Sequence, residues 1–356
     1  MIFENKNRNT RIVKVGNVLI GGENPITIQS MTNTKTSDVE ATVSQILRLE
    51  AAGCEIIRVA VPDEESALSI RKIKDRIHIP LVADIHFDHR LALAAMSSGA
   101  DKIRINPGNM GGREKLSEIV SLARERGVPI RVGVNAGSLE KDLLEKYGHP
   151  TPEALAESCL RNAALLEELD FSNIVLSMKS SDVVTTIEAY RIAAEACDYP
   201  LHLGVTEAGT LISGVIKSSL GIGTLLYMGI GDTIRVSLTC DPVEEVISGA
   251  HILRDLGIRK TGIEIVSCPT CGRCCVGLER LALEVENAIR GMETKNYIKL
   301  AIMGCGVNGP GEAREADLGI AGGVGEFLLF KKGQILTKVK EADVLEALMT
   351  ELKKLI

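Results

Sequence analysis

Gly99-Ala100-Asp101-Lys102-Ile103-Arg104-Ile105-Asn106 is the stretch that decides the fold. A glycine closes a helix-like stretch, and an apolar run of strand length that carries an arginine follows at once. The same arrangement recurs at residues 53–58, 127–131 and 231–235. Because the unit repeats as helix, glycine and buried strand, the sequence predicts a parallel α/β protein.

Eight apolar segments of strand length precede residue 240, with helix-like stretches between them. Strand and helix therefore alternate eight times, which predicts a (β/α)8 TIM barrel, with an open doubly wound sheet as the alternative. Residues 11–22 read as a hairpin that could cap the bottom of the barrel. The eight segments are residues 26–31, 56–61, 81–85, 102–106, 129–135, 173–179, 201–207 and 233–239.

Two of the helix starts can be predicted from their first residues. Ser37-Asp38-Val39-Glu40 has the form of a capping box, in which the serine is the N-cap residue. Thr151-Pro152-Glu153 supplies an N-cap, a proline in the first turn and an early acidic side chain. Both motifs begin helices of the repeating unit.

A smaller α+β domain is predicted where the alternation stops. Short apolar strands and two helices replace the repeat there. The predicted domains are a TIM barrel at residues 1–258, which would bind the substrate, and a smaller domain at residues 259–356, which would bind an iron–sulfur cluster for the reasons given below. A hinge is expected near residues 257–262. The predicted strands of the second domain are residues 263–266, 297–303, 318–321, 326–330 and 334–339, and its helices are 276–289 and 342–355.

Composition narrows the class of protein. Of the 356 residues 45% are hydrophobic and only 3% are aromatic, so we expect an aliphatic core. The net charge of -6 and the lack of a basic block argue against nucleic-acid binding. Neither a membrane-spanning run nor a signal-peptide pattern occurs, so we expect a cytoplasmic protein without a membrane segment. Nine cysteines in such a protein indicate thiols or metal ligands rather than disulfides.

Five cations lie inside predicted barrel strands. A single strand arginine can be structural, paired with an acid in the core. Five that share the interior face repel one another unless an anion binds among them, and arginine forks fit phosphate oxygens. We therefore expect a phosphate or diphosphate site at the barrel mouth, where enzymes of this fold bind ligands. The cations are Arg58, Arg104, Arg131, Lys179 and Arg235.

Other polar residues lie near these cations. Because side chains alternate along a strand, Asn135 and Ser237 share strand faces with two of them. Asp84 and Glu207 come at the ends of the third and seventh strands, and each could act as an acid, a base or a hydrogen-bond orienter. Asp84 is equally well explained as the partner of an arginine. The direction of the Glu207 side chain stays open.

A cysteine pattern in the second domain predicts a metal centre. Ser267-Cys268-Pro269-Thr270-Cys271-Gly272-Arg273 contains a C-x-x-C pair, and Gly304-Cys305-Gly306-Val307-Asn308-Gly309-Pro310-Gly311-Glu312 places a third cysteine in a glycine-rich loop. The pair alone can hold zinc or an iron–sulfur cluster, and the glycine-rich loop favours the cluster. Three thiolates leave a fourth position to another ligand or to chemistry. Cys274 and Cys275 lie close enough in sequence to compete as ligands.

These motifs closely resemble those of the 4-hydroxy-3-methylbut-2-enyl diphosphate synthases, iron–sulfur enzymes of the methylerythritol phosphate route to isoprenoids. The likeness runs from about residue 10 to the C-terminus. It includes Q-S-M-T-N-T, K-I-R-I-N-P-G-N and R-V-G-V-N-A-G-S-L-E as well as both cysteine motifs. In that family a (β/α)8 domain resembling pterin-binding barrels precedes a sulfite-reductase-like cluster domain.

The resemblance implies a set of site residues. A 4Fe–4S cluster would be held by Cys268, Cys271, Cys305 and Glu312, and the glutamate would be the exchangeable ligand during catalysis. Glu207 corresponds to the catalytic acid of the barrel. The family motif does not call for the two extra cysteines, which we expect at a helix start or in the core. The implied substrate-binding residues are Arg58, Arg104, Arg131, Asn135, Lys179, Arg235 and Ser237.

The resemblance also implies a reaction and partners. The expected reaction is reductive ring opening and dehydroxylation of 2-C-methyl-D-erythritol 2,4-cyclodiphosphate to 4-hydroxy-3-methylbut-2-en-1-yl diphosphate. Ferredoxin or flavodoxin would supply two electrons through the cluster, because the chain has no flavin or nicotinamide fingerprint. A head-to-tail homodimer is implied, with one subunit's barrel facing the other's cluster. Two alternatives stay open: a non-redox barrel transferase or aldolase with a structural zinc module, and a cluster-bearing sensor without turnover.

Overall fold

The computed structural model describes residues 8–292, 294, 296–305 and 314–356. The chain divides into two compact units, Met1–Leu256 and Gly257–Ile356. The predicted domain boundary at residue 258 falls in the connection between α9 (Pro242–Asp255) and β11 (Gly262–Ser267). In the described ranges, no helix has both the length and the apolar character that crossing a membrane demands.

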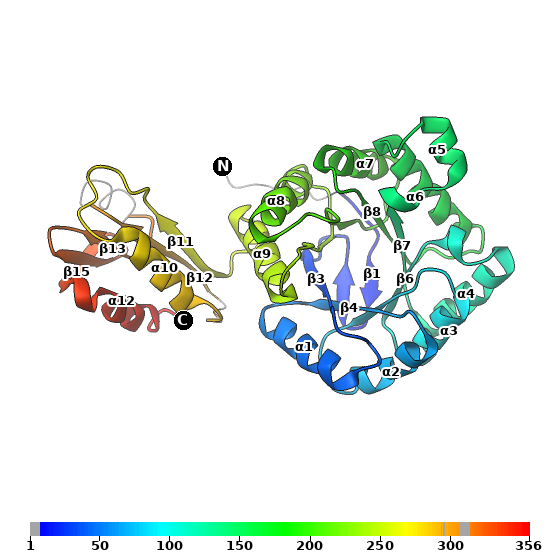
Figure 1. Cartoon of the computed structure of the whole chain (residues 1–356), viewed down its shortest axis with the longest axis horizontal. Helices are drawn as coiled ribbons and strands as arrows, with labels where there is room; N and C mark the ends of the chain where they lie inside the picture. Colours follow the sequence, from blue (N-terminus) through cyan, green and yellow to red (C-terminus); the bar gives the residue numbers. More distant parts are fainter. Residues whose placement is uncertain (1–7, 293, 295, 306–313) are drawn as a thin grey trace. The chain divides into compact units, whose positions relative to one another are not determined.

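The first unit is a parallel barrel surrounded by helices (Figure 1), as the sequence predicts. The eight described strands pair in the order β8-β7-β6-β5-β4-β3-β10-β9, and every pairing is parallel. A parallel bridge between Leu176 and Leu201 joins the two end strands. The sheet therefore closes on itself, and the alternative of an open doubly wound sheet is wrong.

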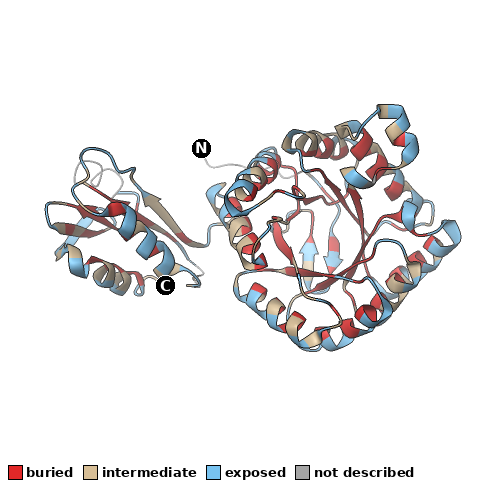
Figure 2. Ribbon diagram, viewed as in Figure 1, coloured by how far each residue is buried: buried red, intermediate tan, exposed pale blue. Residues whose placement is uncertain are grey.

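The buried strands lie inside the ring of helices, and the outer faces of the helices are exposed (Figure 2). The barrel strands are β3 (Thr27–Met31), β4 (Ile56–Ala60), β5 (Leu81–Asp84), β6 (Lys102–Ile105), β7 (Ile130–Asn135), β8 (Ile174–Lys179), β9 (His202–Leu203) and β10 (Thr233–Ile234). Besides α9, the helices are α1 (Val39–Ala51), α2 (Glu64–Lys74), α3 (His89–Ser97), α4 (Arg113–Arg126), α5 (Lys141–Tyr147), α6 (Pro152–Glu167), α7 (Val183–Ala196) and α8 (Leu211–Tyr227). Short 3₁₀ helices occur at Pro107–Asn109, Ala136–Ser138 and Glu341–Asp343.

Two barrel strands are shorter than the sequence predicts. β9 ends at Leu203 and β10 ends at Ile234, although residues up to 207 and 239 were expected to continue them. The amide of Leu238 donates to the carboxylate of Glu245 instead of to a neighbouring strand. Glu207 adopts a φ of 52°, which belongs to the left-handed region and not to a strand.

A hairpin closes the bottom of the barrel, as the sequence predicts. It consists of the antiparallel strands β1 (Val13–Val15) and β2 (Val18–Ile20). Its apolar side chains pack against residues at the amino ends of three barrel strands, so the bottom of the barrel is filled. This buried cluster contains Val13, Val15, Ile20, Ile56, Val82 and Val175.

The two predicted helix starts have different outcomes. Thr151 accepts a hydrogen bond from the amide of Ala154, as an N-cap should. The predicted serine cap of α1 is wrong by one residue. Asp38 is the N-cap, because its carboxylate accepts the amide hydrogen of Ala41 at 3.1 Å. An aspartate next to a serine competes for the same free amides at the helix start.

The second unit is an α+β domain built on a mixed sheet, which confirms the predicted class. Its strands pair in the order β11-β12-β13-β14-β15, parallel from β11 to β13 and antiparallel from there on. The apolar faces of α10 (Leu278–Ile289) and α12 (Val344–Leu352) pack against this sheet in one buried cluster. The remaining strands are β12 (Tyr297–Met303), β13 (Leu318–Gly322), β14 (Glu326–Lys331) and β15 (Gln334–Lys340).

Candidate active site

The carboxyl ends of the barrel strands surround a cavity of about 170 Å³. All five cations predicted from the sequence line it, and so does the predicted Asn135. Ser237 is half-buried, Glu207 is exposed, and neither is among the lining residues. The lining residues are Arg58, Asp84, His86, Arg104, Arg131, Asn135, Ser177, Lys179, Thr206 and Arg235.

Strand register brings these side chains together. Arg104 on β6 lies directly opposite Arg131 on β7, and Asp84 on β5 lies opposite Arg104. One step further along the barrel, Asn135 lies opposite Lys179. Because alternate residues point inward, neighbouring strands place their polar side chains at matching heights.

Asp84 is the acidic residue among the lining side chains. Its carboxylate lies 3.2 Å from Nη1 of Arg104, 3.7 Å from Nε of Arg58 and 3.8 Å from Nε2 of His86. Burial by itself raises the pKa of Asp84, but the charges of the surrounding arginines outweigh it and hold the pKa below its usual range. Asp84 therefore stays ionised, which favours its role as an arginine partner over that of a proton donor.

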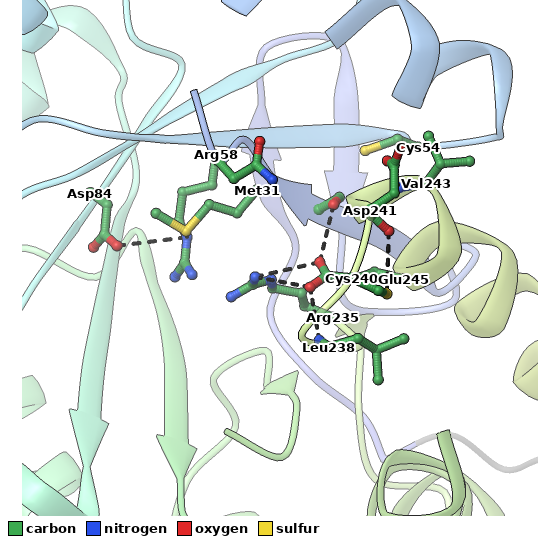
Figure 3. A network of polar contacts seen from close by, with 12 residues as sticks. Met31, Cys54, Arg58, Asp84, Arg235, Leu238, Cys240, Asp241, Val243 and Glu245 are labelled. Carbon is green, nitrogen blue, oxygen red and sulfur yellow. Dashed lines mark hydrogen bonds and ion pairs between the residues drawn. The ribbon is translucent and has the colours of Figure 1, made fainter. Parts of the chain in front are cut away.

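Glu245 is a second acid that the sequence analysis missed. It comes from α9 and is only 4% exposed. Figure 3 shows its carboxylate between the guanidinium of Arg235, at 3.4 Å, and the amide of Leu238, at 2.9 Å. The hydroxyl of Ser30 also donates to it. A glutamate on the otherwise apolar inner face of a helix was the signal that could have identified it.

Positive charge in the cavity is only partly balanced. Arg131 is fully buried, and none of its three guanidinium nitrogens has a hydrogen-bond partner among the described residues. Burial lowers the pKa of Arg131, and the charges of Arg58 and Arg104 lower it further. The pKa of Lys179 is lowered for the same two reasons, burial and nearby arginines. A buried cation without a partner is costly, so an anion in the cavity would be bound favourably.

Two glycines leave room for these cations. A Cβ atom at Gly133 would lie 2.1 Å from Nε of Arg104, and one at Gly204 would lie 3.0 Å from Nζ of Lys179. The Arg104 guanidinium lies against the Gly133 backbone and donates to its carbonyl at 3.1 Å. The position of Arg104 therefore depends on the absence of a side chain at residue 133.

Gly133→Ala is expected to weaken anion binding by roughly tenfold, the cost of about one lost charged hydrogen bond. The added methyl group would push Arg104 away from Asp84 and from the Gly133 carbonyl. Calorimetric titration with inorganic pyrophosphate measures the effect. Gly137→Ala is the matched control, since a Cβ atom there meets nothing within 4 Å. Equal affinities in the two variants would contradict this role of Gly133.

Two cysteines of the second unit lie just beyond one edge of its sheet, at the carboxyl ends of neighbouring parallel strands. Cys268 follows β11 directly, and Cys305 comes two residues after β12, its parallel neighbour. The amide of Gly304 donates to the sulfur of Cys268 at 3.1 Å. Cys271 is exposed, and its carbonyl accepts the amide hydrogen of Cys274, which closes the turn that follows the C-x-x-C motif.

Cys274 and Cys275 differ in their surroundings. Cys274 is half-buried and packs against the core of the second unit, whereas Cys275 is exposed. A Cβ atom at Gly304 would lie 2.6 Å from the sulfur of Cys274, so this glycine is required by packing. Both cysteines precede α10, whose predicted start at residue 276 is two residues too early because the helix begins at Leu278.

The cysteine sulfurs near this edge of the sheet are the kind of donor atom that binds an iron–sulfur cluster. Thiolates are its usual ligands, and a peptide N–H that donates to a cysteine sulfur stabilises the thiolate. Within the described residues, no group of three or more His, Cys, Asp or Glu side chains is already arranged to hold a metal ion. The predicted fourth ligand, Glu312, lies outside the described residues.

Family models match nearly the whole chain. A model described as the GcpE TIM-barrel domain matches residues 10–250, and one described as the GcpE protein C-terminal domain matches residues 264–354. Among the most similar curated proteins are two named 4-hydroxy-3-methylbut-2-en-1-yl diphosphate synthase (flavodoxin). That of Caldanaerobacter subterraneus subsp. tengcongensis is 62% identical, covering 98% of this chain and 97% of the relative. That of Clostridium perfringens is 60% identical, covering 96% and 97%.

Solved structures are similar in fold. Plasmodium falciparum HPPK-DHPS superimposes with a TM-score of 0.51 at 12% identity, over 70% of this chain and 48% of that chain. Dihydropteroate synthase of Yersinia pestis gives a TM-score of 0.48 at 12% identity, over 69% and 97%. At such low identity the first likeness concerns the barrel fold alone.

Proposed function

The chain belongs to the GcpE family of 4-hydroxy-3-methylbut-2-en-1-yl diphosphate synthases, oxidoreductases of isoprenoid synthesis, and from this we propose its substrate, cofactor and site residues. The proposed reaction is reductive ring opening and dehydroxylation of 2-C-methyl-D-erythritol 2,4-cyclodiphosphate to 4-hydroxy-3-methylbut-2-en-1-yl diphosphate. One observation carries the substrate assignment: five cations line one cavity with a single acidic side chain among its lining residues. Family membership removes the alternatives of a non-redox enzyme and of a sensor.

The barrel cations bind the diphosphate in this proposal. Arg131 lines the cavity with three nitrogens that have no partner among the described residues, and Asn135 and Lys179 lie opposite each other at the carboxyl ends of β7 and β8. Arg104 is held in place by Asp84 and by the Gly133 carbonyl, so it needs no rearrangement to meet a phosphate oxygen. Of the residues that the family resemblance adds, Ser237 is outside the cavity lining and would contact substrate only from its edge.

The proposed cofactor is a 4Fe–4S cluster in the second unit. Cys268, Cys271, Cys305 and Glu312 would hold it. When bound, the cluster supplies single electrons at low potential, which the barrel residues cannot do. Flavodoxin or ferredoxin is the proposed donor, and the relatives' names include flavodoxin. The amide of Gly304 would hold the Cys268 sulfur in place as a ligand, because it donates to that sulfur.

Glu207 is the proposed proton donor to the departing oxygen. It lies in the loop after β9, next to Thr206, which lines the cavity. Its left-handed φ of 52° is uncommon for a residue with a side chain, and such conformations cluster at functional sites.

The proposed enzyme is a head-to-tail homodimer, in which one subunit's barrel faces the cluster of the other.

Glu207→Gln is expected to lower kcat by roughly 100-fold or more, because glutamine keeps the shape of the side chain but cannot donate the proton. KM should change little, since glutamine keeps the size and shape of the side chain and the barrel cations that bind the diphosphate are unchanged. Steady-state kinetics with reduced flavodoxin measure both constants. A normal kcat would show that another group delivers the proton.

Anaerobic turnover tests the proposed reaction. Reconstituted protein is incubated with the cyclodiphosphate and chemically reduced flavodoxin, and products are followed by phosphorus NMR. The proposal predicts loss of the cyclic diphosphate signals and formation of a linear allylic diphosphate. Binding of the substrate without any product, in protein that carries its cluster, would contradict it.

A further inference from the structure

A buried lysine lies inside the barrel, beneath the cavity. Lys102 is the first residue of β6 and comes two residues before Arg104, so the two side chains share the inward face. Lys102 is fully buried and is not among the residues that line the cavity. Directly opposite it on β5 lies Val82, which belongs to the apolar cluster at the bottom of the barrel. Lys102 therefore lies between the cavity and the apolar bottom.

The amine of Lys102 has nothing to balance a positive charge. Its Nζ atom forms no hydrogen bond among the described residues. Burial lowers the pKa of Lys102 well below its usual range, and the charges of Arg131 and Arg58 lower it further. An ammonium group at this place would be buried, unpaired and repelled by two guanidinium groups. These conditions favour the neutral amine in the ligand-free protein.

His202 of β9 is a second buried base near Lys102. It is fully buried and lies opposite Thr233 on β10, whose hydroxyl oxygen is 3.4 Å from its Nδ1. Its Nε2 has no hydrogen-bond partner within the described part of the chain. Burial lowers the pKa of His202 well below its usual range, and the charges of Arg131, Lys179 and Lys102 lower it further. Two bases below the cavity are thus kept neutral by the cations around them.

The groups that face Lys102 come from the neighbouring strands and from its own. Asp84 is the acid among them, and its carboxylate already contacts Arg104, Arg58 and His86. It therefore leaves the charge of a protonated Lys102 unbalanced. The titratable and charged groups around Lys102 are Arg58 on β4, Asp84 on β5, Arg104 on β6, Arg131 on β7 and His202 on β9.

We infer that Lys102 is neutral while the cavity holds no anion and takes up a proton from solvent when a multiply charged anion enters the cavity. The negative charge of the anion offsets the repulsion by the arginines, so the ammonium form of Lys102 becomes the favoured one. Anion binding and proton uptake then strengthen each other. Lys102 acts on the anion through its charge and does not touch it. The inference rests on the anion site of the proposed function and adds how the charge of that site is balanced.

The linkage sets the direction of the pH effect. Below the pKa that Lys102 has in the ligand-free protein, this residue is already charged and the anion binds most tightly. Above that pKa, binding requires the uptake of a proton, so the affinity falls by up to about tenfold per pH unit for this one group. His202 and Lys179 have lowered pKa values too and contribute in the same direction. A substitution is therefore needed to isolate the share of Lys102.

Calorimetric titration with inorganic trimetaphosphate tests the inference. The ring phosphates of this anion are strongly acidic, so its charge stays constant from mildly acidic to mildly alkaline pH. Titrations in buffers that differ in their enthalpy of ionisation give the number of protons taken up. Where wild-type uptake is greatest, Lys102→Met should take up roughly one proton fewer, and its affinity should depend less on pH. Lys14→Met is the control and should match wild type, since Lys14 is an exposed lysine of the bottom hairpin.

Lys102→Leu is the second variant and guards against an effect of methionine on packing. Wild-type binding without net proton uptake overturns the inference, whatever the variants do. So does equal uptake in wild type and both variants, or a failure of wild type to bind both trimetaphosphate and the cyclodiphosphate without an electron donor. Turnover is measured separately. Uptake that depends on Lys102 in an inactive protein would contradict the proposed function alone, whereas an active enzyme whose uptake is independent of Lys102 would contradict the inference alone.

Discussion

Cys271→Ser is expected to abolish turnover and to remove most of the bound iron, whereas Cys275→Ser should leave both unchanged. The two thiols are matched, because both are exposed and lie four residues apart, so neither substitution disturbs packing. Serine is a poor replacement for a thiolate that binds iron. Iron content and the visible absorption spectrum after anaerobic reconstitution give the readout.

Cys274→Ser separates a core residue from a ligand. The side chain of Cys274 packs against the core of the second unit and fills the space beside Gly304. We expect the Cys274→Ser variant to keep its cluster. It should lose some thermal stability, because a hydroxyl replaces an apolar sulfur. Loss of the cluster in Cys275→Ser or Cys274→Ser, with retention in Cys271→Ser, would show that the chosen ligands are wrong.

Arg131→Met is expected to weaken binding of the cyclodiphosphate by about 2–3 kcal/mol and yet to stabilise the ligand-free protein. Arg131 is buried with no hydrogen-bond partner among the described residues, and Arg58 and Arg104 repel it. An apolar side chain of similar length removes that cost. Thermal unfolding without ligand should therefore shift upward, while the further shift that the ligand produces should shrink.

Arg235→Met is the matched control, with the opposite effect on stability. Arg235 pairs with Glu245, and that carboxylate is only 4% exposed. Removing the cation leaves a buried carboxylate with weaker compensation, so we expect a loss of about 1–3 kcal/mol of stability together with weaker binding. Equal destabilisation of the ligand-free protein by both variants would show that the charge of Arg131 is already balanced within the protein. The argument that this charge favours anion binding in the cavity would then be wrong.

The barrel and its cations could be predicted because their signals are local. A glycine, an apolar run and an inward arginine repeat within a few residues, as at Arg58 and Arg104, and strand alternation fixes the faces of their side chains. The closed barrel was predicted from the eight alternations of strand and helix along the chain. The hairpin that fills its bottom was also predictable, since its apolar residues alternate around a turn.

Other features depend on contacts between distant segments. Glu245 is recognised only when α9 is packed beside Arg235, and Gly133 only when Arg104 lies across it. The early ends of β9 and β10 follow from side-chain and loop partners that no pattern within those segments indicates. Asp38 and its neighbouring serine have similar capping ability, so the sequence alone does not choose between them. The roles of Glu207, Ser237 and Glu312 stay predictions.

Iron and acid-labile sulfide analysis of anaerobically purified protein tests most directly whether this chain is an iron–sulfur oxidoreductase. We predict about four irons and four sulfides per chain, with a brown colour that bleaches in air. Stoichiometric zinc without labile sulfide would contradict the proposed cofactor and, with it, the reductive chemistry assigned to the barrel.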